Sequence, residues 1–174
     1  MKSPIDTNNL NNISHWYALY TRSRYEKKVD YLLKEKGVTS FLPLTEAYHK
    51  WSDRYQKVLI PLFSCYVFVF IALRERLKVL KTFGAVKLVS FNGTPAVIPD
   101  DQINTVKQIL SEKLNVKQAD FFTPGNKVRV KHGPLKGVEG TLVHKSNKNR
   151  LIIAIDGIKQ ALSIEIDYRD LEIL

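Results

Sequence analysis

The side chains of this 174-residue chain that could carry out catalysis are few and lie far apart. Metal sites use histidine, cysteine or carboxylate ligands at short, characteristic spacings, and the four histidines show no such spacing. The single cysteine, Cys65, lies in an apolar stretch, where a thiol is normally inert packing. No glycine-rich phosphate loop or carboxylate pair stands out. We therefore expect no catalysis, no metal and no cofactor.

Basic and aromatic residues offer a different chemistry, the binding of a polyanion. Lysine and arginine number 27 against 17 aspartate and glutamate residues, which gives a net charge of +10. Such a charge favours an acidic partner, either nucleic acid or a machine that handles it. Four cations follow the first apolar segment: Arg22, Arg24, Lys27 and Lys28. The alternative for each is an ordinary solvated charge, because surface lysines also keep a protein soluble.

A second basic and aromatic segment is expected in a hairpin. It interleaves His49, Lys50, Trp51, Arg54 and Tyr55. Packing of an edge strand is the plain explanation of this pattern, and nucleic-acid contact is the alternative.

The apolar run of residues 60–71, IPLFSCYVFVFI, contrasts with the basic composition around it. It is too short for a spanning helix, which needs about 20 apolar residues, and its β-branched and aromatic content favours a strand. A buried central strand explains most positions, while a partner surface could use one edge. Since the N-terminal segment also lacks an apolar signal core, we expect no membrane association and a cytoplasmic protein.

Periodicity predicts an α+β domain in the first part of the chain. Residues 15–21 indicate a strand, and Ser23 with Glu26 has the S-x-x-E spacing of a capping box at a helix start. Gly37 is expected to end that helix. Further strands are predicted at residues 60–71 and 86–91, and further helices at residues 74–82 and 99–110. This order is typical of an antiparallel sheet with helices packed on it.

The rest of the chain predicts a separate small domain. Residues 1–14 are polar and are expected to be disordered, and residues 15–110 form the first domain. Residues 111–120 break the periodicity and indicate a linker. Residues 121–174 contain five short apolar segments separated by turn residues, which predicts a small β-barrel.

Residues 122–143, FTPGNKVRVKHGPLKGVEGTLV, resemble the KOW motif at the C-terminus of NusG proteins. Glycines in such a small barrel permit tight turns and close strand crossings. The residues that match are Gly125, Gly133, Pro134, Gly137 and Gly140. The pattern implies an SH3-like β-barrel, a fold that also occurs in ribosomal proteins.

Two further segments resemble the N-terminal (NGN) domain of the NusG family. WYALYTRSRYEKKVDYLL, from Trp16, is similar to its first strand and helix, and PLFSCYVFV is similar to its signature strand. VKLVSFNGTPAVIPDDQI is similar to its closing strand and last helix. Chain length, Tyr20 and the FLPL segment look closer to the specialised paralogues RfaH and the UpxY regulators. The chain departs from the signature at Ser64 and Cys65, where the family has Pro and often Gly or Asn.

The resemblance implies a monomeric transcription elongation or antitermination factor whose first domain grips the clamp helices of bacterial RNA polymerase. The apolar contact residues that it implies are Trp16, Tyr20, Phe63, Tyr66 and Phe68. Arg22, Arg24, Lys27 and Lys28 would meet the non-template DNA strand in the transcription bubble.

The barrel would recruit Rho or a small-subunit ribosomal protein. The regulated unit would be a specific long operon, such as a capsular polysaccharide locus. Two alternatives stay open, a ribosome-associated RNA-binding protein and a housekeeping NusG that couples to Rho.

Overall fold

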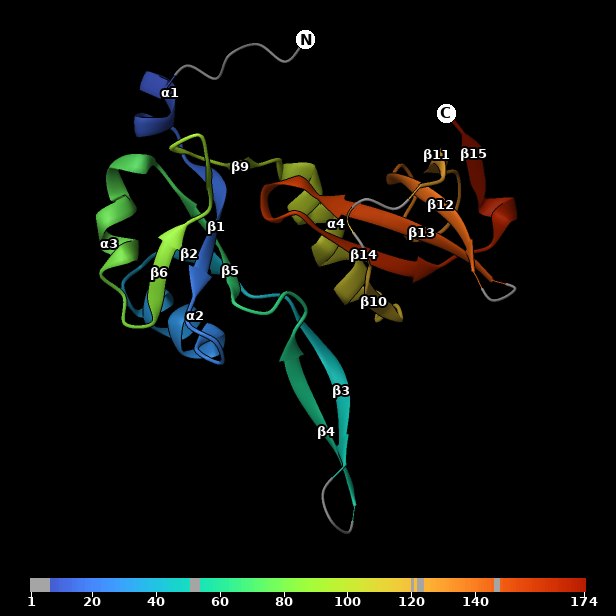
Figure 1. Cartoon of the computed structure of the whole chain (residues 1–174), viewed down its shortest axis with the longest axis horizontal. Helices are drawn as coiled ribbons and strands as arrows, with labels where there is room; N and C mark the ends of the chain where they lie inside the picture. The colour runs from blue at the N-terminus through green and yellow to red at the C-terminus, as the bar shows by residue number, and fades with distance from the viewer. Residues whose placement is uncertain (1–6, 51–53, 120, 122–123, 146–147) are drawn as a thin grey trace. The chain divides into compact units, whose positions relative to one another are not determined.

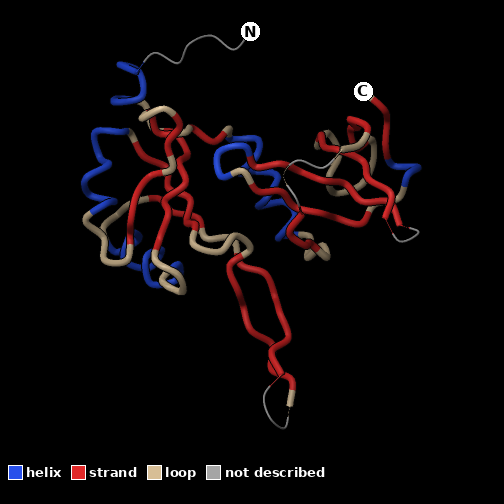
Figure 2. Tube along the Cα trace, viewed as in Figure 1, coloured by secondary structure: helices blue, strands red, loops and turns tan. Residues whose placement is uncertain are grey.

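The computed structural model describes residues 7–50, 54–119, 121, 124–145 and 148–174. The chain forms two compact units, Met1–Asp100 and Asp101–Leu174, and each is described by itself. Figure 1 labels their helices and strands, and Figure 2 separates helix, strand and loop by colour.

The first unit is built on an antiparallel sheet in the order β2-β5-β1-β6, with β9 also paired to β1. Its strands are β1 (His15–Thr21), β2 (Thr39–Phe41), β5 (Tyr66–Ile71), β6 (Ala85–Leu88) and β9 (Val97–Ile98). The central strand β1 is the HWYALYT segment predicted from sequence, and it pairs with β5 from His15↔Ile71 to Tyr20↔Tyr66. The predicted sheet of an α+β domain is confirmed.

Helices cover one face of this sheet, as Figure 1 shows for α2 and α3 beside β1 and β6. They are α1 (Thr7–Asn12), α2 (Glu26–Glu35), the 3-10 turn η1 (Leu73–Glu75) and α3 (Arg76–Leu80). Strand side chains alternate between faces, so Tyr17 and Leu19 point to the helices. There they join Val29 and Leu33 of α2 and Val79 of α3, all fully buried, in one apolar core.

The N-terminal segment is more ordered than its polar composition predicts. Residues Thr7–Asn12 form α1, and Leu10 is only 2% exposed within the core of the first unit. The expectation of disorder is therefore wrong for these six residues, because one apolar side chain packs against the core. Residues 1–6 lie outside the described part.

The predicted capping box is also wrong. Helix α2 begins at Glu26 with Tyr25 at the N-cap, and Tyr25 makes no capping hydrogen bond through its side chain. Arg24 adopts a left-handed conformation with φ of 65°, so the chain turns sharply after Ser23 and places it outside the helix. The Glu26 carboxylate instead accepts a hydrogen bond of 2.7 Å from the backbone N–H of Cys65.

The apolar run of residues 60–71 is not one strand. Its first residues end β4 (Tyr55–Pro61), which pairs with β3 (Leu44–Lys50) in a two-stranded ribbon drawn apart from the sheet in Figure 1. The chain then turns, with Cys65 in a left-handed conformation (φ 66°), before β5 starts. Trp51 of the predicted hairpin lies outside the described residues.

A tight turn at Asn92-Gly93 joins two very short strands, β7 (Ser90–Phe91) and β8 (Thr94–Pro95). Both turn residues have positive φ, 50° and 79°, which is the conformation that such hairpin turns require.

The second unit begins with α4 (Asp100–Ser111), the helix predicted at residues 99–110. A six-stranded antiparallel sheet follows, in the order β10-β14-β13-β12-β11-β15. Its strands are β10 (Val116–Ala119), β11 (Asn126–Val130), β12 (Glu139–Lys145), β13 (Lys148–Ile155), β14 (Gln160–Glu165) and β15 (Leu171–Ile173). Two 3-10 turns, η2 (Asp156–Ile158) and η3 (Tyr168–Asp170), join the last strands. The predicted all-β C-terminal region is confirmed.

The segment predicted as a linker contributes a sixth strand. Residues 116–119 form β10 and pair with β14, from Val116↔Ile164 to Ala119↔Ala161. Lys117 and Gln118 are exposed and make the composition of this segment polar. The strand forms because its backbone pairs with β14, and amino-acid composition does not reveal such pairing. The boundary between the units falls between Asp100 and Asp101, at the first residue of α4, whereas the sequence analysis placed this helix in the first domain. Among the described residues no helix is long and apolar enough to cross a membrane.

Candidate functional site

An aromatic face lies on the side of the first sheet that is opposite to α2 and α3. Tyr17 and Leu19 point to the helices, so Trp16 and Tyr20 of β1 point the other way. Strand pairing brings Tyr66 beside Tyr20, with ring centroids 5.5 Å apart, and Phe70 beside Trp16, with centroids 5.3 Å apart. The sheet register thus gathers rings from two strands on one surface.

Burial divides the five residues predicted to contact a protein partner. Phe63 and Phe68 are fully buried and pack edge to face, with centroids 5.9 Å apart, and Trp16 is only 8% exposed. Tyr20 and Tyr66 are half-buried. The two tyrosines therefore offer accessible surface in this structure, while the other three rings are buried.

The Tyr20–Tyr66 pair is an apolar and uncharged feature. Burial, followed by the nearby Tyr20 and Cys65, raises the pKa of Tyr66 above its ordinary value of 10.0. The phenol therefore stays protonated at neutral pH. A half-buried tyrosine presents a large ring with a polar tip, which suits a protein contact.

The position of Tyr66 depends on the turn before β5. Cys65 has a φ of 66°, a conformation that glycine and asparagine adopt more readily than other residues. In this chain the Glu26 carboxylate holds the Cys65 N–H, and the Cys65 carbonyl accepts a hydrogen bond of 2.9 Å from the backbone of Thr21.

All four cations predicted to bind nucleic acid are exposed, but they differ in what they contact. Lys27 donates a hydrogen bond of 2.7 Å to the backbone carbonyl of Leu59, so it ties α2 to the base of the β3–β4 ribbon. Arg24 lies in the left-handed turn before α2. Arg22 and Lys28 converge on one ring, that of Phe83.

The sequence analysis missed Phe83. It is 55% exposed between α3 and β6, with the Arg22 guanidinium carbon 5.7 Å and the Lys28 ammonium 5.0 Å from its ring centroid. The Tyr25 ring meets its edge at 5.6 Å. We call Arg22, Lys28 and Phe83 the cation–aromatic cluster. An aromatic residue directly before a glycine, Phe83-Gly84, was the signal that could have found it.

Gly84 allows this cluster to form. Its φ is 93°, and an added Cβ would lie 2.9 Å from Cδ1 of Tyr25 and 3.0 Å from Cγ2 of Val29. Its carbonyl accepts a hydrogen bond of 2.9 Å from the Arg22 backbone N–H. The close approach of the chain to α2 therefore places Phe83 beside Arg22 and Lys28.

In the second unit, the glycines singled out from sequence have two structural roles. Gly133 and Gly137 have positive φ, 83° and 87°, in the loop between β11 and β12. Gly125 and Gly140 lack positive φ but have no room for a Cβ. A Cβ added at Gly125 would lie 2.3 Å from the Leu142 carbonyl oxygen, and one added at Gly140 would lie 2.6 Å from the Ile152 carbonyl oxygen.

Pro134 belongs to the same loop, and its carbonyl accepts a hydrogen bond from the Gln108 side chain of α4.

A depression of about 820 Å³ lies on this unit. Its lining includes apolar Phe121, Ile152 and Leu174 together with charged Lys127 and Asp156.

In the described part of the chain, three or more histidine, cysteine or acidic side chains do not come together in a group able to hold a metal ion. The charged and aromatic arrangements above can bind and position partners.

Comparison with known proteins finds one matching family and a solved structure with a similar fold. The family described as NusG, transcription termination factor nusG, matches residues 14–107, more than half of the chain. A structure described as "Domain interaction in Thermotoga maritima NusG" matches with a TM-score of 0.56 and 20% identity, covering 91% of this chain and 96% of that chain. At this identity the similarity shows a shared fold.

A structure described as "Crystal Structure of MjSpt4:Spt5 complex conformation A" matches at 13% identity over 91% of this chain and 97% of that chain. Its TM-score of 0.30 is too low to carry an argument. No curated protein matches the sequence.

Proposed function

The chain belongs to the NusG family of transcription factors, and we propose that it binds the clamp helices of bacterial RNA polymerase and promotes processive elongation. The observation that carries this proposal is the half-buried Tyr20–Tyr66 pair on the face of the sheet opposite to α2 and α3. Aromatic pairs of this kind bury much area while freezing few rotors, so they anchor protein interfaces well. Trp16, Phe63 and Phe68 are buried in the same unit.

The mechanism is a shift between two states of the polymerase. A ligand changes such an equilibrium only by its difference in affinity for the two states. A protein that grips the closed clamp better than the open one therefore stabilises the processive form. Binding energy alone is enough for this effect, in keeping with a family of transcription factors rather than enzymes.

We propose that the cation–aromatic cluster contacts the non-template DNA strand. Phe83 offers a stacking platform for an unpaired base, and Arg22 and Lys28 beside it can approach the phosphates. Arg24 is exposed nearby and can add charge, while Lys27 positions the β3–β4 ribbon through Leu59. Reading of that strand would restrict the factor to a specific long operon.

For the second unit, we propose a KOW barrel that recruits a protein partner, either Rho or a small-subunit ribosomal protein. The depression lined by Phe121, Ile152 and Leu174 is the candidate surface. Deleting the gene tests the breadth of action: a defect confined to one long operon supports a specialised factor, whereas a global expression defect supports a housekeeping role.

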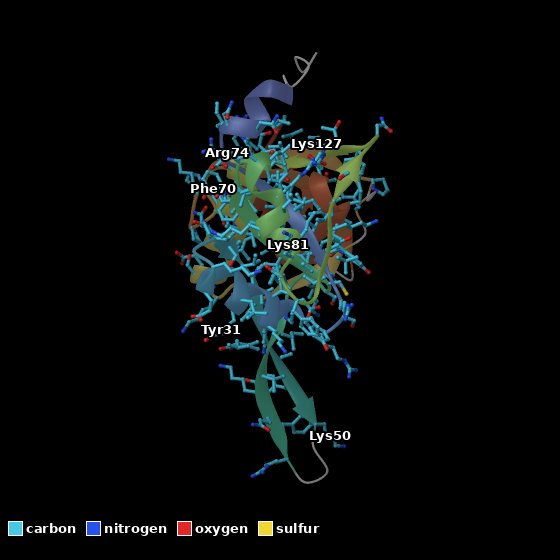
Figure 3. The ribbon with its side chains drawn as sticks, turned by 90° about the vertical axis from the view of Figure 1, so that its left-hand side faces the viewer. Tyr31, Lys50, Phe70, Arg74, Lys81 and Lys127 are labelled. Carbon is cyan, nitrogen blue, oxygen red and sulfur yellow. The ribbon has the colours of Figure 1, made fainter. Side chains whose placement is uncertain are left out.

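The polymerase contact is tested by binding of the full chain to purified bacterial core RNA polymerase. We expect Tyr20→Ala and Tyr66→Ala each to weaken binding by about 10-fold or more, as truncation of interface anchors does. Tyr31→Ala is the matched control, because Tyr31 is 62% exposed on α2, on the opposite side of the sheet, where Figure 3 labels it.

Two results would contradict the proposal. Equal losses for all three variants would mean that the tyrosine pair is not the anchor. Tight binding to free RNA that falls steeply with salt, without affinity for polymerase, would favour the ribosome-associated alternative.

A further inference from the structure

Strand β10 covers what would otherwise be an open edge of the second sheet. It pairs with β14 on one side, and within the described ranges no further strand pairs with its outer side. The strand that it covers belongs to the core: Ala161 and Leu162 are fully buried, and Ile164 is only 2% exposed. If β10 left, the backbone N–H and C=O groups along β14 would form an exposed edge, which is a template for pairing with another chain.

The contacts that hold β10 are few and lie close to water. Lys117 and Gln118 are exposed, while Val116 and Ala119 are only half-buried. Gln118 donates a hydrogen bond of 3.2 Å to the side chain of Gln160, and this contact is exposed as well. A short strand that buries little apolar surface belongs to the part of a protein that opens locally at low free energy.

The same strand extends the face that carries the depression of the second unit. Ala119 stands opposite Ala161, which stands opposite Ala154, so these three residues share one face of the sheet. Ala154 lines the depression, and so does Phe121, two residues beyond the end of β10. The Phe121 ring lies 4.9 Å from the Lys159 ammonium. The pairing of β10 with β14 therefore also positions Phe121 at the depression.

We propose that β10 is an exchangeable cover of the β14 edge, and that an extended segment of a partner protein adds to β14 in its place. Strand addition draws its affinity from backbone hydrogen bonds and its specificity from alternate side chains. The register of β10 defines the segment that fits: its first and last residues are apolar and half-buried, and its two middle residues are polar and exposed. A nucleic acid lacks the alternating N–H and C=O groups with which this edge pairs.

This inference rests on the proposed recruitment of a protein by the second unit, and it adds a form of regulation. When a site is open for only a fraction of the time, the apparent affinity of its ligand falls by that fraction. The strength of the pairing between β10 and β14 would thus set how tightly the partner binds. The segment that looks like a linker acts as a competitor for the site.

The test uses a fluorescent peptide of residues 114–121, LNVKQADF, as a probe for the free edge of β14 in the full chain. The opened variant carries Lys117→Pro and Gln118→Pro. Proline has no backbone N–H, and one of two successive N–H groups in a strand must point to the paired neighbour. The matched control carries Lys117→Ala and Gln118→Ala, which remove the same side chains and keep both N–H groups. Thermal melting checks that both variants fold.

A second variant closes the edge instead of opening it. Ala119→Cys and Ala161→Cys are introduced together with Cys65→Ser, which removes the native thiol. Positions 119 and 161 are directly opposite, and the Cα separation of such pairs suits a disulfide. Oxidised glutathione forms the bond and dithiothreitol reverses it, so the reduced protein is the control for the oxidised one.

We expect the peptide to bind the proline variant about 10-fold or more tightly than the wild-type protein, because the edge is then open for most of the time. The alanine control should stay within about 3-fold of the wild type. Oxidation of the double-cysteine variant should weaken peptide binding by about 10-fold or more. In hydrogen exchange, the amides of Val116–Ala119 should exchange faster than those of Leu151–Ile155 in the wild-type protein.

Equal peptide affinities of the proline and alanine variants, or of the oxidised and reduced protein, would overturn the proposal. Equal exchange protection of β10 and β13 would do so too. A disulfide that joins two chains would assign the edge to a second copy of this protein and would also overturn it. The proposed recruitment is judged separately, by competition of purified Rho and of small-subunit ribosomal proteins with the peptide. If the peptide behaves as expected and none of these proteins competes, that recruitment fails while the exchangeable cover stands.

Discussion

At the scale of the residue, Cys65 and Glu26 show how one turn is held from two sides. The left-handed conformation of Cys65 lets the chain turn from the β3–β4 ribbon into β5. The buried Glu26 carboxylate satisfies the Cys65 N–H at 2.7 Å. Glu26 therefore makes a contact 39 residues away along the chain. Its place in an S-x-x-E pattern predicted a local capping hydrogen bond and not this distant one.

Cys65→Gly should stabilise the protein by about 0.5–1 kcal/mol, because glycine adopts positive φ without the steric cost that a Cβ brings. Urea unfolding of the variant and the wild-type protein measures the difference. Ser64→Gly is the control: Ser64 does not have a positive φ, so glycine there should only add freedom to the unfolded chain and lower stability. A Cys65→Gly protein no more stable than the wild type would show that the turn is unstrained.

At the scale of the element, the sequence predicted strands and helices better than their ends. The alternation in HWYALYT and the i, i+4 repeat of Val29 and Leu33 reflect burial on one face, which is a local pattern. The split of the apolar run at Leu62 and the pairing of Val116–Ala119 depend on distant backbone partners. Phe83 entered the candidate site only through tertiary contacts with Arg22 and Lys28.

Gly84→Ala and Gly93→Ala compare two turns that share positive φ and differ in surroundings. An added Cβ at Gly93 meets nothing within 4 Å, whereas at Gly84 it lies 2.9 Å from the Tyr25 ring. We expect Gly84→Ala to cost about 1–3 kcal/mol more than Gly93→Ala, since the helix must yield to the extra atom. Equal losses in chemical denaturation would mean that α2 moves aside freely.

The η3 turn of the second unit carries a predicted pH effect. The Arg169 side chain, followed by the Arg169 backbone N–H, lowers the pKa of Asp167 from 3.8 to about 2. A carboxylate with a lowered pKa in the folded state contributes stability above pH 3.8 and loses it as the pH falls toward 2. NMR titration of the Asp167 carboxyl carbon should give a midpoint near 2, and Arg169→Ala should raise it. A midpoint of 3.8 in the wild-type protein would show that the turn is open in solution.

At the scale of the whole molecule, the first sheet separates two kinds of surface. The rings of Tyr20 and Tyr66 lie on its face opposite to α2 and α3, while Phe83 lies on the helix side, beside Lys28 of α2. The net charge of +10 favours long-range attraction to nucleic acid, and the tyrosine face adds a contact that salt screens little. Under the proposed function, this arrangement would let one small domain hold a protein and a nucleic acid at the same time.

The separation predicts that the two binding activities can be removed independently. Tyr66→Ala should weaken polymerase binding and leave binding of free single-stranded DNA within about 2-fold, because the altered ring lies across the sheet from the cations. Phe83→Ala should do the reverse. In the double variant the two free-energy losses, measured on polymerase bound to an open DNA bubble, should add within about 0.5 kcal/mol. A larger deviation from additivity would show that the sheet transmits one contact to the other, so that the two faces act as a single site.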